Sequence, residues 1–303
     1  MDYFNCLTVT PEKAKELSPD LPAWFNPVWM QAVGGLYSIT PKVLIVTKND
    51  NPVARLPFYE KCFLRFRQAY NPTLVYYTPV FFTLPERKNA NRNQLLQYEI
   101  MLRMGEYLKR HYTKVLLSLT PEVWDIRGFT EEGLNAVPRY TYILNLKKQS
   151  EFFLGEAAKI RRGEREGYVF SAGKAPERML EMVYAMYERK KHPFPQDREG
   201  VLRLMKTGLD EGILEQYNIL RDNEIVSSIA IINDREQTAY GWLMATEQEE
   251  MKQGASLILF KELFQALRER FMAFDLCGAN SKGPSRLKAA LGAELKLFFR
   301  IIK

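Results

Sequence analysis

The strongest chemical signal lies near the end of the 303-residue chain. A predicted strand over Ala273–Cys277 carries Asp275 and runs into a glycine-containing loop with Asn280. A short basic helix follows, which carries Lys288 and ends at Gly292. Because ligands of open α/β sheets bind at the carboxyl ends of strands, Asp275 and Lys288 are candidate catalytic residues and Asn280 a candidate substrate contact. The alternative is an ordinary strand–loop–helix connection in which the glycine only terminates the helix.

A second candidate is the basic stretch Lys159–Gly167, which has four cations within seven positions. Arg161 and Arg162 could hold a phosphate or another polyanionic part of a substrate, because a guanidinium group binds such anions in bidentate fashion. The alternative is a solvated helix face.

Histidine and cysteine are too few for most metal or nucleophile chemistry. The histidines are His111 and His192. His111 has no cysteine or carboxylate at ligand spacing, and His192 stands beside two prolines in a loop. Cys6, Cys62 and Cys277 are far apart, so neither a thiolate zinc site nor a disulfide framework is expected. The chain also lacks GxGxxG and GxxxxGK[ST] motifs. We therefore expect no metal, no catalytic triad and no permanently bound cofactor.

The elements that must position these residues occur twice along the chain. Both copies contain a strand–turn–strand pattern with an Asn/Asp turn, at Val43–Leu56 and Tyr217–Ala230, which is typical of a hairpin. Each copy continues in the same order with an aromatic strand, an amphipathic helix, a short strand and a final apolar strand. These elements are Val75–Pro79, a helix with Leu95 to Leu108, Val115–Leu119 and Tyr140–Leu146, then Ala239–Leu243, a helix with Leu259 to Phe271, Ala273–Cys277 and Leu295–Ile302.

This repeat predicts two related domains of mixed α/β architecture, 1–146 and 147–303. The joint is expected at Lys147–Ser150, and a mostly helical segment, Glu151–Lys191, should follow it. Pro176 suits the first turn of a helix, and His192–Pro195 should end it.

Composition agrees with a globular protein that needs no metal or disulfide for stability. Apolar residues make up 46% of the chain and aromatic residues 13%. The net charge of +7 could attract polyanions or could serve only solubility. No stretch is long and apolar enough to span a bilayer, and the first residues lack the pattern of a signal peptide. A cytoplasmic protein is the expectation.

Two of these segments carry a family resemblance. The segment from Phe274 to Glu294 resembles the C-terminal motif of the FemAB/FemX-like transferases and related BioF2-like acetyltransferase domains. The matching residues are Phe274, Asp275, Gly278, Lys288, Gly292 and Glu294, and Leu287 and Leu291 stand in place of two phenylalanines. Arg161, Arg162 and Gly167 are similar to the basic stretch that begins the second domain of that family. The resemblance implies two tandem GNAT-like acyl-CoA N-acyltransferase folds, with the active site in the second.

The resemblance also implies a place for the donor. In a CoA-binding GNAT domain, backbone N–H groups of an R/Q-x-x-G-x-G/A motif hold the pyrophosphate at a helix N-terminus. The same register here gives Met251 followed by Gln253, Gly254, Ala255 and Ser256, so these last four residues are the candidate donor-binding residues. Met251 departs from the motif, which argues against CoA as the donor. The chain also lacks the helical hairpin of the family's aminoacyl-tRNA-dependent members, which argues against aminoacyl-tRNA. Acyl-CoA and aminoacyl-tRNA both stay open as donors.

The function expected from the resemblance is N-acyl transfer to an amine acceptor, such as a small molecule or a cell-wall precursor. Backbone N–H groups near Trp242–Met244 would stabilise the oxyanion, and Tyr240 and Trp242 would line the substrate site, although aromatic strand residues are more often core. The first copy has no glycine at Asn91–Gln94, where its helix begins, so it should lack a donor site. The alternative is an inactive tandem GNAT protein that binds a polyanion such as RNA or a nucleotide-linked precursor.

Overall fold

The computed structural model describes residues 3–85, 90–148, 152–234, 237–280 and 282–303. The chain divides into two compact units, the first formed by residues 1–140 and 296–303 and the second by residues 141–295. The predicted division at 146/147 differs from this one, because the last strand of the chain belongs to the first unit. Residues 149–151 of the predicted joint lie outside the described residues.

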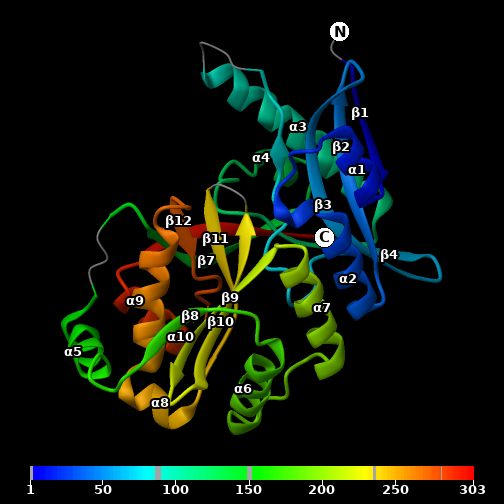
Figure 1. Cartoon of the computed structure of the whole chain (residues 1–303). Helices are drawn as coiled ribbons and strands as arrows, with labels where there is room; N and C mark the ends of the chain where they lie inside the picture. Colours follow the sequence, from blue (N-terminus) through cyan, green and yellow to red (C-terminus); the bar gives the residue numbers. More distant parts are fainter. Residues whose placement is uncertain (1–2, 86–89, 149–151, 235–236, 281) are drawn as a thin grey trace. The chain divides into compact units, whose positions relative to one another are not determined.

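The first unit is a mixed sheet, with both antiparallel and parallel strand pairs, and helices cover it (Figure 1). Its strands lie in the order β1-β2-β3-β4-β6-β13, and β5 pairs with β3. Helix α3 packs on this sheet through Ile100, Met104 and Leu108, which belong to a core with Leu44 and Leu117. Its elements are β1 (Phe4–Val9), α1 (Pro11–Leu17), the 3-10 helix η1 (Ala23–Phe25), α2 (Pro27–Tyr37), β2 (Thr40–Lys48), β3 (Asn51–Phe63), β4 (Phe66–Tyr70), β5 (Phe81–Phe82), α3 (Ala90–His111), β6 (Lys114–Ser118), α4 (Arg127–Glu131) and β13 (Glu294–Ile302).

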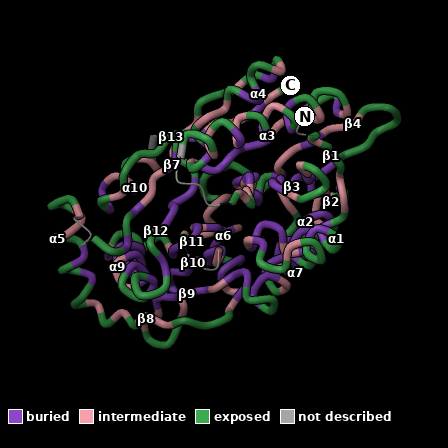
Figure 2. The backbone as a smooth tube through the Cα atoms, turned by 90° about the horizontal axis from the view of Figure 1, so that it is seen from above, coloured by how far each residue is buried: buried purple, intermediate pink, exposed green. Residues whose placement is uncertain are grey.

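The second unit repeats this plan, with strand order β8-β9-β10-β11-β12-β7. Helix α9 packs on one face of the sheet through Leu259, Leu263 and Phe264, and α6 and α7 cover the other face. The central strands β9, β10 and β11 are largely buried (Figure 2). Its elements are β7 (Asn135–Asn145, from residue 141), α5 (Leu154–Gly163), β8 (Val169–Ala172), α6 (Pro176–Arg189), α7 (Arg198–Asp210), β9 (Leu214–Arg221), β10 (Glu224–Asp234), β11 (Thr238–Thr246), α8 (Gln248–Gln253), α9 (Ala255–Leu267), β12 (Ala273–Asp275) and α10 (Lys282–Ala290).

The two predicted hairpins are confirmed and occupy equivalent places, second and third in each strand order. Both turns use two residues with positive φ, Asn49 (50°) with Asp50 (65°) and Asp222 (51°) with Asn223 (66°). Asn and Asp tolerate this left-handed conformation, and a two-residue turn of this kind matches the twist of a hairpin. The tandem α/β interpretation of the sequence is therefore confirmed.

Two strand predictions are wrong. Residues 75–79 form no strand apart from an isolated bridge at Thr78, and the strand in that place of the first unit is β4. The final strands of the two copies are also exchanged: β7 pairs with β12 of the second unit, and β13 pairs with β6 of the first. Apolar alternation indicates that a strand exists but not which neighbour it pairs with.

The helical prediction for 151–191 holds for α5 and α6 but misses β8 between them. Pro176 lies at the first turn of α6, as expected, and the helix ends at Arg189 before the proline loop. No helix in the described ranges combines the length and apolar character needed to cross a bilayer.

Candidate active site

The parallel strands β11 and β12 share only a short ladder. Thr238, Ala239 and Tyr240 pair with Ala273, Phe274 and Asp275, and β11 then continues alone on that side to Thr246 within the described structure. The carboxyl end of β11 thus extends beyond β12. This is the position at which open α/β sheets bind ligands.

A β-bulge marks the same part of β11. Ala230 of β10 lies opposite Leu243, whereas the next residue, Ile231, lies opposite Gly241, so Trp242 is the extra residue. Bulges re-aim backbone groups and are common beside active sites. The Trp242 and Tyr240 side chains are 2% and 5% exposed, so both also belong to the packed interior.

Asp275 ends β12 as a fully buried carboxylate. It accepts a hydrogen bond from the Thr141 hydroxyl at 2.5 Å and one from the Cys277 backbone N–H at 2.8 Å. Cys277 and Gly278 have φ values of 46° and 74°, so the chain turns sharply after the strand. The carboxylate therefore holds this turn in place. Burial, with Asp275 nearby, raises the pKa of the Cys277 thiol far above its ordinary value, so this thiol stays neutral.

Lys288 belongs to the same cluster. Its ammonium donates to the backbone carbonyls of Cys277 and Gly278, the two residues of the left-handed turn. Burial lowers the pKa of Lys288, while Cys277 and Asp275 act in the opposite direction. Since an ammonium group has three N–H donors, one remains for another acceptor. Asn280 is exposed on the loop that follows the turn.

The predicted donor-binding residues lie at the start of α9. Gly254 has a φ of 99° and joins α8 to α9, which begins at Ala255. The N-terminal residues Gly254, Ala255 and Ser256 are buried, and a Cβ atom on Gly254 would lie 3.0 Å from the Lys159 carbonyl oxygen of α5. The first of these residues therefore packs closely against α5.

The predicted basic residues Arg161 and Arg162 lie on α5, which packs next to the start of α9. Arg162 donates to the Lys252 carbonyl in the last turn of α8, and Gly163 lies against Ile258 of α9. Arg161 is exposed on α5. The structure thus collects the predicted residues into two groups, one around Asp275 and Lys288 and one around Gly254 and Arg162.

Substitution of Gly254 tests the contact between α5 and α9. We expect Gly254→Ala to destabilise the protein by about 1–2 kcal/mol, because a side chain at this φ is strained and would press on α5. Gly155→Ala within α5 is the matched control: its Cβ would meet nothing within 4 Å, so this change should stabilise the helix by up to about 1 kcal/mol. Urea unfolding of both variants measures the difference. Equal effects would contradict the proposed contact.

Sequence reasoning missed the residues that fix α8. Glu250 accepts a hydrogen bond from the Tyr168 hydroxyl at 2.6 Å and pairs with Arg221 at 3.2 Å, and Arg221 also lies 3.5 Å from Glu166. The carboxylate partners hold Arg221 in its charged form and raise its pKa. These residues are distant in sequence, so only the fold brings them together.

A buried polar network on β9 and β10 was also missed. Gln216 donates to Ser228 and to Asn218 at 3.0 Å, and Asn218 donates to the Gly173 carbonyl at 2.9 Å. Gln216 also bonds the backbone of Ala175, the residue before α6. The network fixes the entry into α6. Polar residues at alternate positions of a buried strand were the available signal.

No cluster of three or more His, Cys, Asp or Glu side chains that could hold a metal ion occurs among the described residues.

Comparisons with known proteins agree with this architecture. Residues 157–287 match the family model described as acetyltransferase (GNAT) domain. Among solved structures, the chain is similar to FemX, with 11% identity, a TM-score of 0.66 and coverage of 97% of this chain and 96% of that one. A search of curated proteins found no match.

Two further structures share the fold. One is the C-terminal domain of a protein described as a lysylphosphatidylglycerol synthetase from Agrobacterium fabrum, with 12% identity, a TM-score of 0.60 and coverage of 97% and 90% of the two chains. The other is a tandem GNAT protein from the clavulanic acid biosynthesis pathway, with 10% identity, a TM-score of 0.51 and coverage of 99% and 98%. The domain match thus assigns a GNAT acetyltransferase domain to residues 157–287, and the solved structures share the fold of the whole chain.

Proposed function

We propose that the second unit transfers an aminoacyl group from aminoacyl-tRNA to an amine acceptor, at the carboxyl end of β11. The observation that carries this proposal is the continuation of β11 past β12, with its bulge at Trp242, inside a GNAT domain. The bulged strand can turn backbone N–H groups toward an acyl oxygen. The name of the A. fabrum neighbour, a lysylphosphatidylglycerol synthetase, favours aminoacyl chemistry.

The choice of donor rests on the packing at the start of α9. A CoA pyrophosphate would need the backbone N–H groups of Gly254–Ser256, but these residues are buried and Gly254 packs against α5. Met251 also stands where CoA-binding motifs have Arg or Gln. Aminoacyl-tRNA does not need this cradle, and the exposed Arg161 on α5 suits a polyanionic donor.

In the proposed reaction, the acceptor nitrogen attacks the ester carbonyl carbon of the donor. The carbonyl oxygen then carries negative charge, which backbone N–H groups near Trp242 and the remaining N–H of Lys288 would stabilise. Collapse of the tetrahedral intermediate breaks the C–O bond, and the ribose hydroxyl of the tRNA leaves. The acceptor nitrogen loses one proton and the leaving oxygen gains one. Asp275 acts by holding the turn to which Lys288 binds.

A transfer assay with labelled donors tests this proposal. The purified chain would be incubated with tRNA charged with ¹⁴C-amino acids, and in parallel with ¹⁴C-acetyl-CoA, together with amine acceptors that include cell-wall precursors. We expect label to move from aminoacyl-tRNA and not from acetyl-CoA. Transfer only from acetyl-CoA would overturn the choice of donor. Binding of tRNA without any transfer would instead favour an inactive polyanion-binding protein, for which the net charge of +7 is suited.

A further inference from the structure

The tip of the β3–β4 hairpin in the first unit exposes three large apolar side chains close together in the sequence. Phe63, Leu64 and Phe66 are 69%, 85% and 49% exposed. Phe63 and Phe66 lie directly opposite each other in the ladder, so their rings share one face of the hairpin. The strands project from the unit near the label β4, and the loop is exposed along its length (Figures 1 and 2). A cluster of this kind on a protruding tip marks an interaction site.

Leu64 at the tip of the hairpin adopts a strained backbone conformation. Leu64 has a φ of 52°, a left-handed conformation that costs a residue with a Cβ atom about 1–2 kcal/mol and that glycine adopts freely. Hairpin turns of two residues normally use Gly, Asn or Asp at such positions, as the β2–β3 and β9–β10 turns of this chain do. A leucine at this position therefore lowers stability, which points to a role for its side chain.

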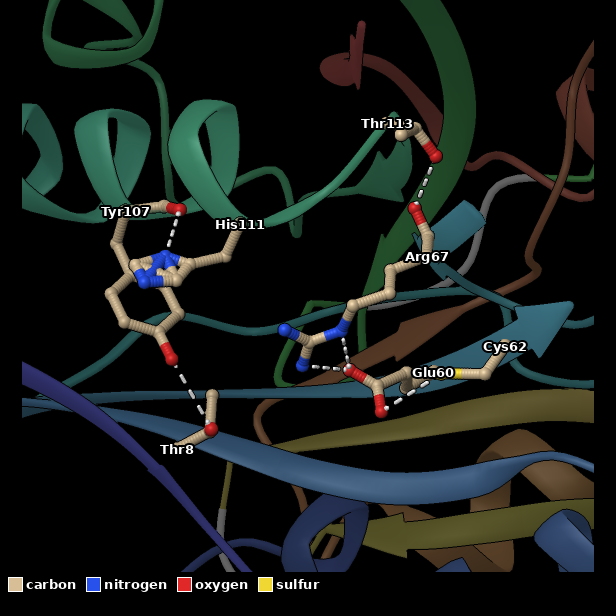
Figure 3. Close-up of polar contacts among 7 residues, drawn as sticks. All are labelled: Thr8, Glu60, Cys62, Arg67, Tyr107, His111 and Thr113. Atoms are coloured by element: carbon tan, nitrogen blue, oxygen red, sulfur yellow. Dashed lines mark hydrogen bonds and ion pairs between the residues drawn. The ribbon is translucent and has the colours of Figure 1, made fainter. Parts of the chain in front are cut away.

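The base of the hairpin is held rigidly beneath this tip. The Arg67 guanidinium makes two hydrogen bonds to one carboxylate oxygen of Glu60, at 2.6 and 3.1 Å, and lies over the Tyr112 ring at 4.9 Å. The Thr113 hydroxyl donates to the Arg67 carbonyl at 2.7 Å, and the Cys62 thiol donates to Glu60 at 3.4 Å (Figure 3). Because these contacts fix the base of the hairpin, the apolar tip can enter an apolar environment without a change in the hairpin's conformation.

The charges around the tip are positive. Lys61 and Arg65 are exposed beside the apolar residues, and neither has a carboxylate partner in the described parts of the chain. The sequence from Lys61 to Tyr70 contains no acidic residue, and Glu60 is already paired with Arg67. Apolar side chains flanked by cations match the surface of an anionic bilayer, where the former enter the acyl boundary and the latter meet phosphate groups.

We propose that the hairpin tip, residues 61–66, docks the protein on the surface of an anionic lipid membrane. Phe63, Leu64 and Phe66 enter the interface between headgroups and acyl chains, and Lys61 and Arg65 bind lipid phosphates. The site is distinct from the candidate active site and does not depend on the proposed transfer reaction. Its function is to bring the protein to a membrane reversibly, since a few interfacial side chains give weak binding.

Co-sedimentation with lipid vesicles tests the proposal. We expect the protein to sediment with vesicles of phosphatidylcholine mixed with phosphatidylglycerol, and far less with phosphatidylcholine alone. Replacing Phe63, Leu64 and Phe66 together by serine should weaken binding roughly tenfold or more. Lys61→Glu and Arg65→Glu should each weaken binding to the anionic vesicles by at least about fivefold. Raising the salt concentration should reduce binding of the wild-type protein.

Matched variants separate docking from folding. Leu154→Ser removes a leucine that is 90% exposed on α5, and Lys15→Glu reverses an exposed cation on α1, so both should leave vesicle binding unchanged. Leu64→Gly should weaken binding while its melting temperature stays equal or rises, because glycine relieves the strained φ. This variant remains informative even if the triple serine variant fails to fold.

A probe on the hairpin gives an independent measurement. Cys62 is exposed, whereas Cys6 is half-buried and Cys277 is buried, so a thiol-reactive environment-sensitive dye should label Cys62 preferentially. Its emission should shift to the blue when anionic vesicles are added. The proposal is overturned if the protein binds neither type of vesicle, if the triple serine variant binds as well as wild type, or if the tip instead mediates concentration-dependent self-association without lipid.

Discussion

Asp275→Ala should destabilise the second unit by about 2–4 kcal/mol and abolish transfer activity. The carboxylate is fully buried and accepts hydrogen bonds from the Thr141 hydroxyl and the Cys277 N–H. Removing it leaves both donors unsatisfied inside the protein, and each buried unsatisfied group costs about 1–3 kcal/mol. The sharp turn at Cys277 and Gly278 would lose the hydrogen bond from the Cys277 N–H to the Asp275 carboxylate. The same turn carries the carbonyl groups that Lys288 binds. The midpoint of urea-induced unfolding measures the first effect and the labelled-donor assay the second.

A double-mutant cycle with Thr141 separates the hydrogen bond from other effects. Thr141→Val keeps the shape of the side chain but removes the hydroxyl donor, and should cost about 1–2 kcal/mol. If the bond at 2.5 Å stabilises the fold, the two changes should be non-additive, with a coupling energy of about 0.5–3 kcal/mol. Asp210→Ala is the control, because its carboxylate is exposed and pairs with an exposed lysine, and this change should stay within about 0.5 kcal/mol. An Asp275→Ala variant that is as stable as wild type yet inactive would assign the carboxylate a direct chemical role instead.

Most of the fold could be predicted from the sequence where local chemistry dictates it. The Asn49–Asp50 and Asp222–Asn223 turns tolerate positive φ, and they fix two hairpins in equivalent sheet positions. Pro176 starts α6 because a proline at the first turn lacks only an N–H that would be unpaired there. The periodic apolar residues of α9 face the core of the second unit as expected.

Strand pairing could not be predicted, because it depends on contacts between distant segments. The pattern of Leu295–Ile302 indicates a strand equally well in either unit, and only the fold shows that it pairs with β6. Phe66–Tyr70 forms β4 although Val75–Pro79 is the more apolar segment. Proline at position 79 lacks the N–H needed for a ladder, which is consistent with the irregular path observed there.

The candidate site shows the same division. The sequence indicated Asp275, Lys288, Gly254 and Arg162, but not how they group. The contact of Arg162 with the Lys252 carbonyl places the basic stretch against α8, and Gly163 lies against Ile258 of α9. These are contacts between distant segments, which the sequence pattern does not indicate. The catalytic and binding roles assigned to these residues stay predictions.

Lys288 offers the sharpest test of those roles. The sequence predicts it as a catalytic residue. Its ammonium binds the Cys277 and Gly278 carbonyls, which leaves one N–H available. We expect Lys288→Met to lower kcat by about 10²–10³-fold, because charge-assisted stabilisation of the acyl oxygen would be lost. The loss of two charge-assisted bonds should cost about 1–3 kcal/mol of stability.

Lys303 supplies a matched control in the first unit. Its ammonium also binds two backbone carbonyls, those of Lys109 and Tyr112, at 2.5 and 2.6 Å. Lys303→Met should therefore destabilise the protein to a similar extent and leave transfer activity unchanged. If the two variants lose the same stability and the same activity, Lys288 acts only through the fold.

The pH dependence of transfer adds a readout that a purely structural lysine would not move. Burial lowers the pKa of Lys288 below its ordinary value of 10.5, so its positive charge is lost at a lower pH than that of an exposed lysine. Activity should therefore decline on the alkaline side before pH 10.5 is reached, while the Lys303→Met variant should keep the wild-type profile. The residual transfer activity of the Lys288→Met variant should not show this decline at alkaline pH. If the variant shows the same decline as wild type, another group is responsible for it and the Lys288 ammonium takes no part in the reaction.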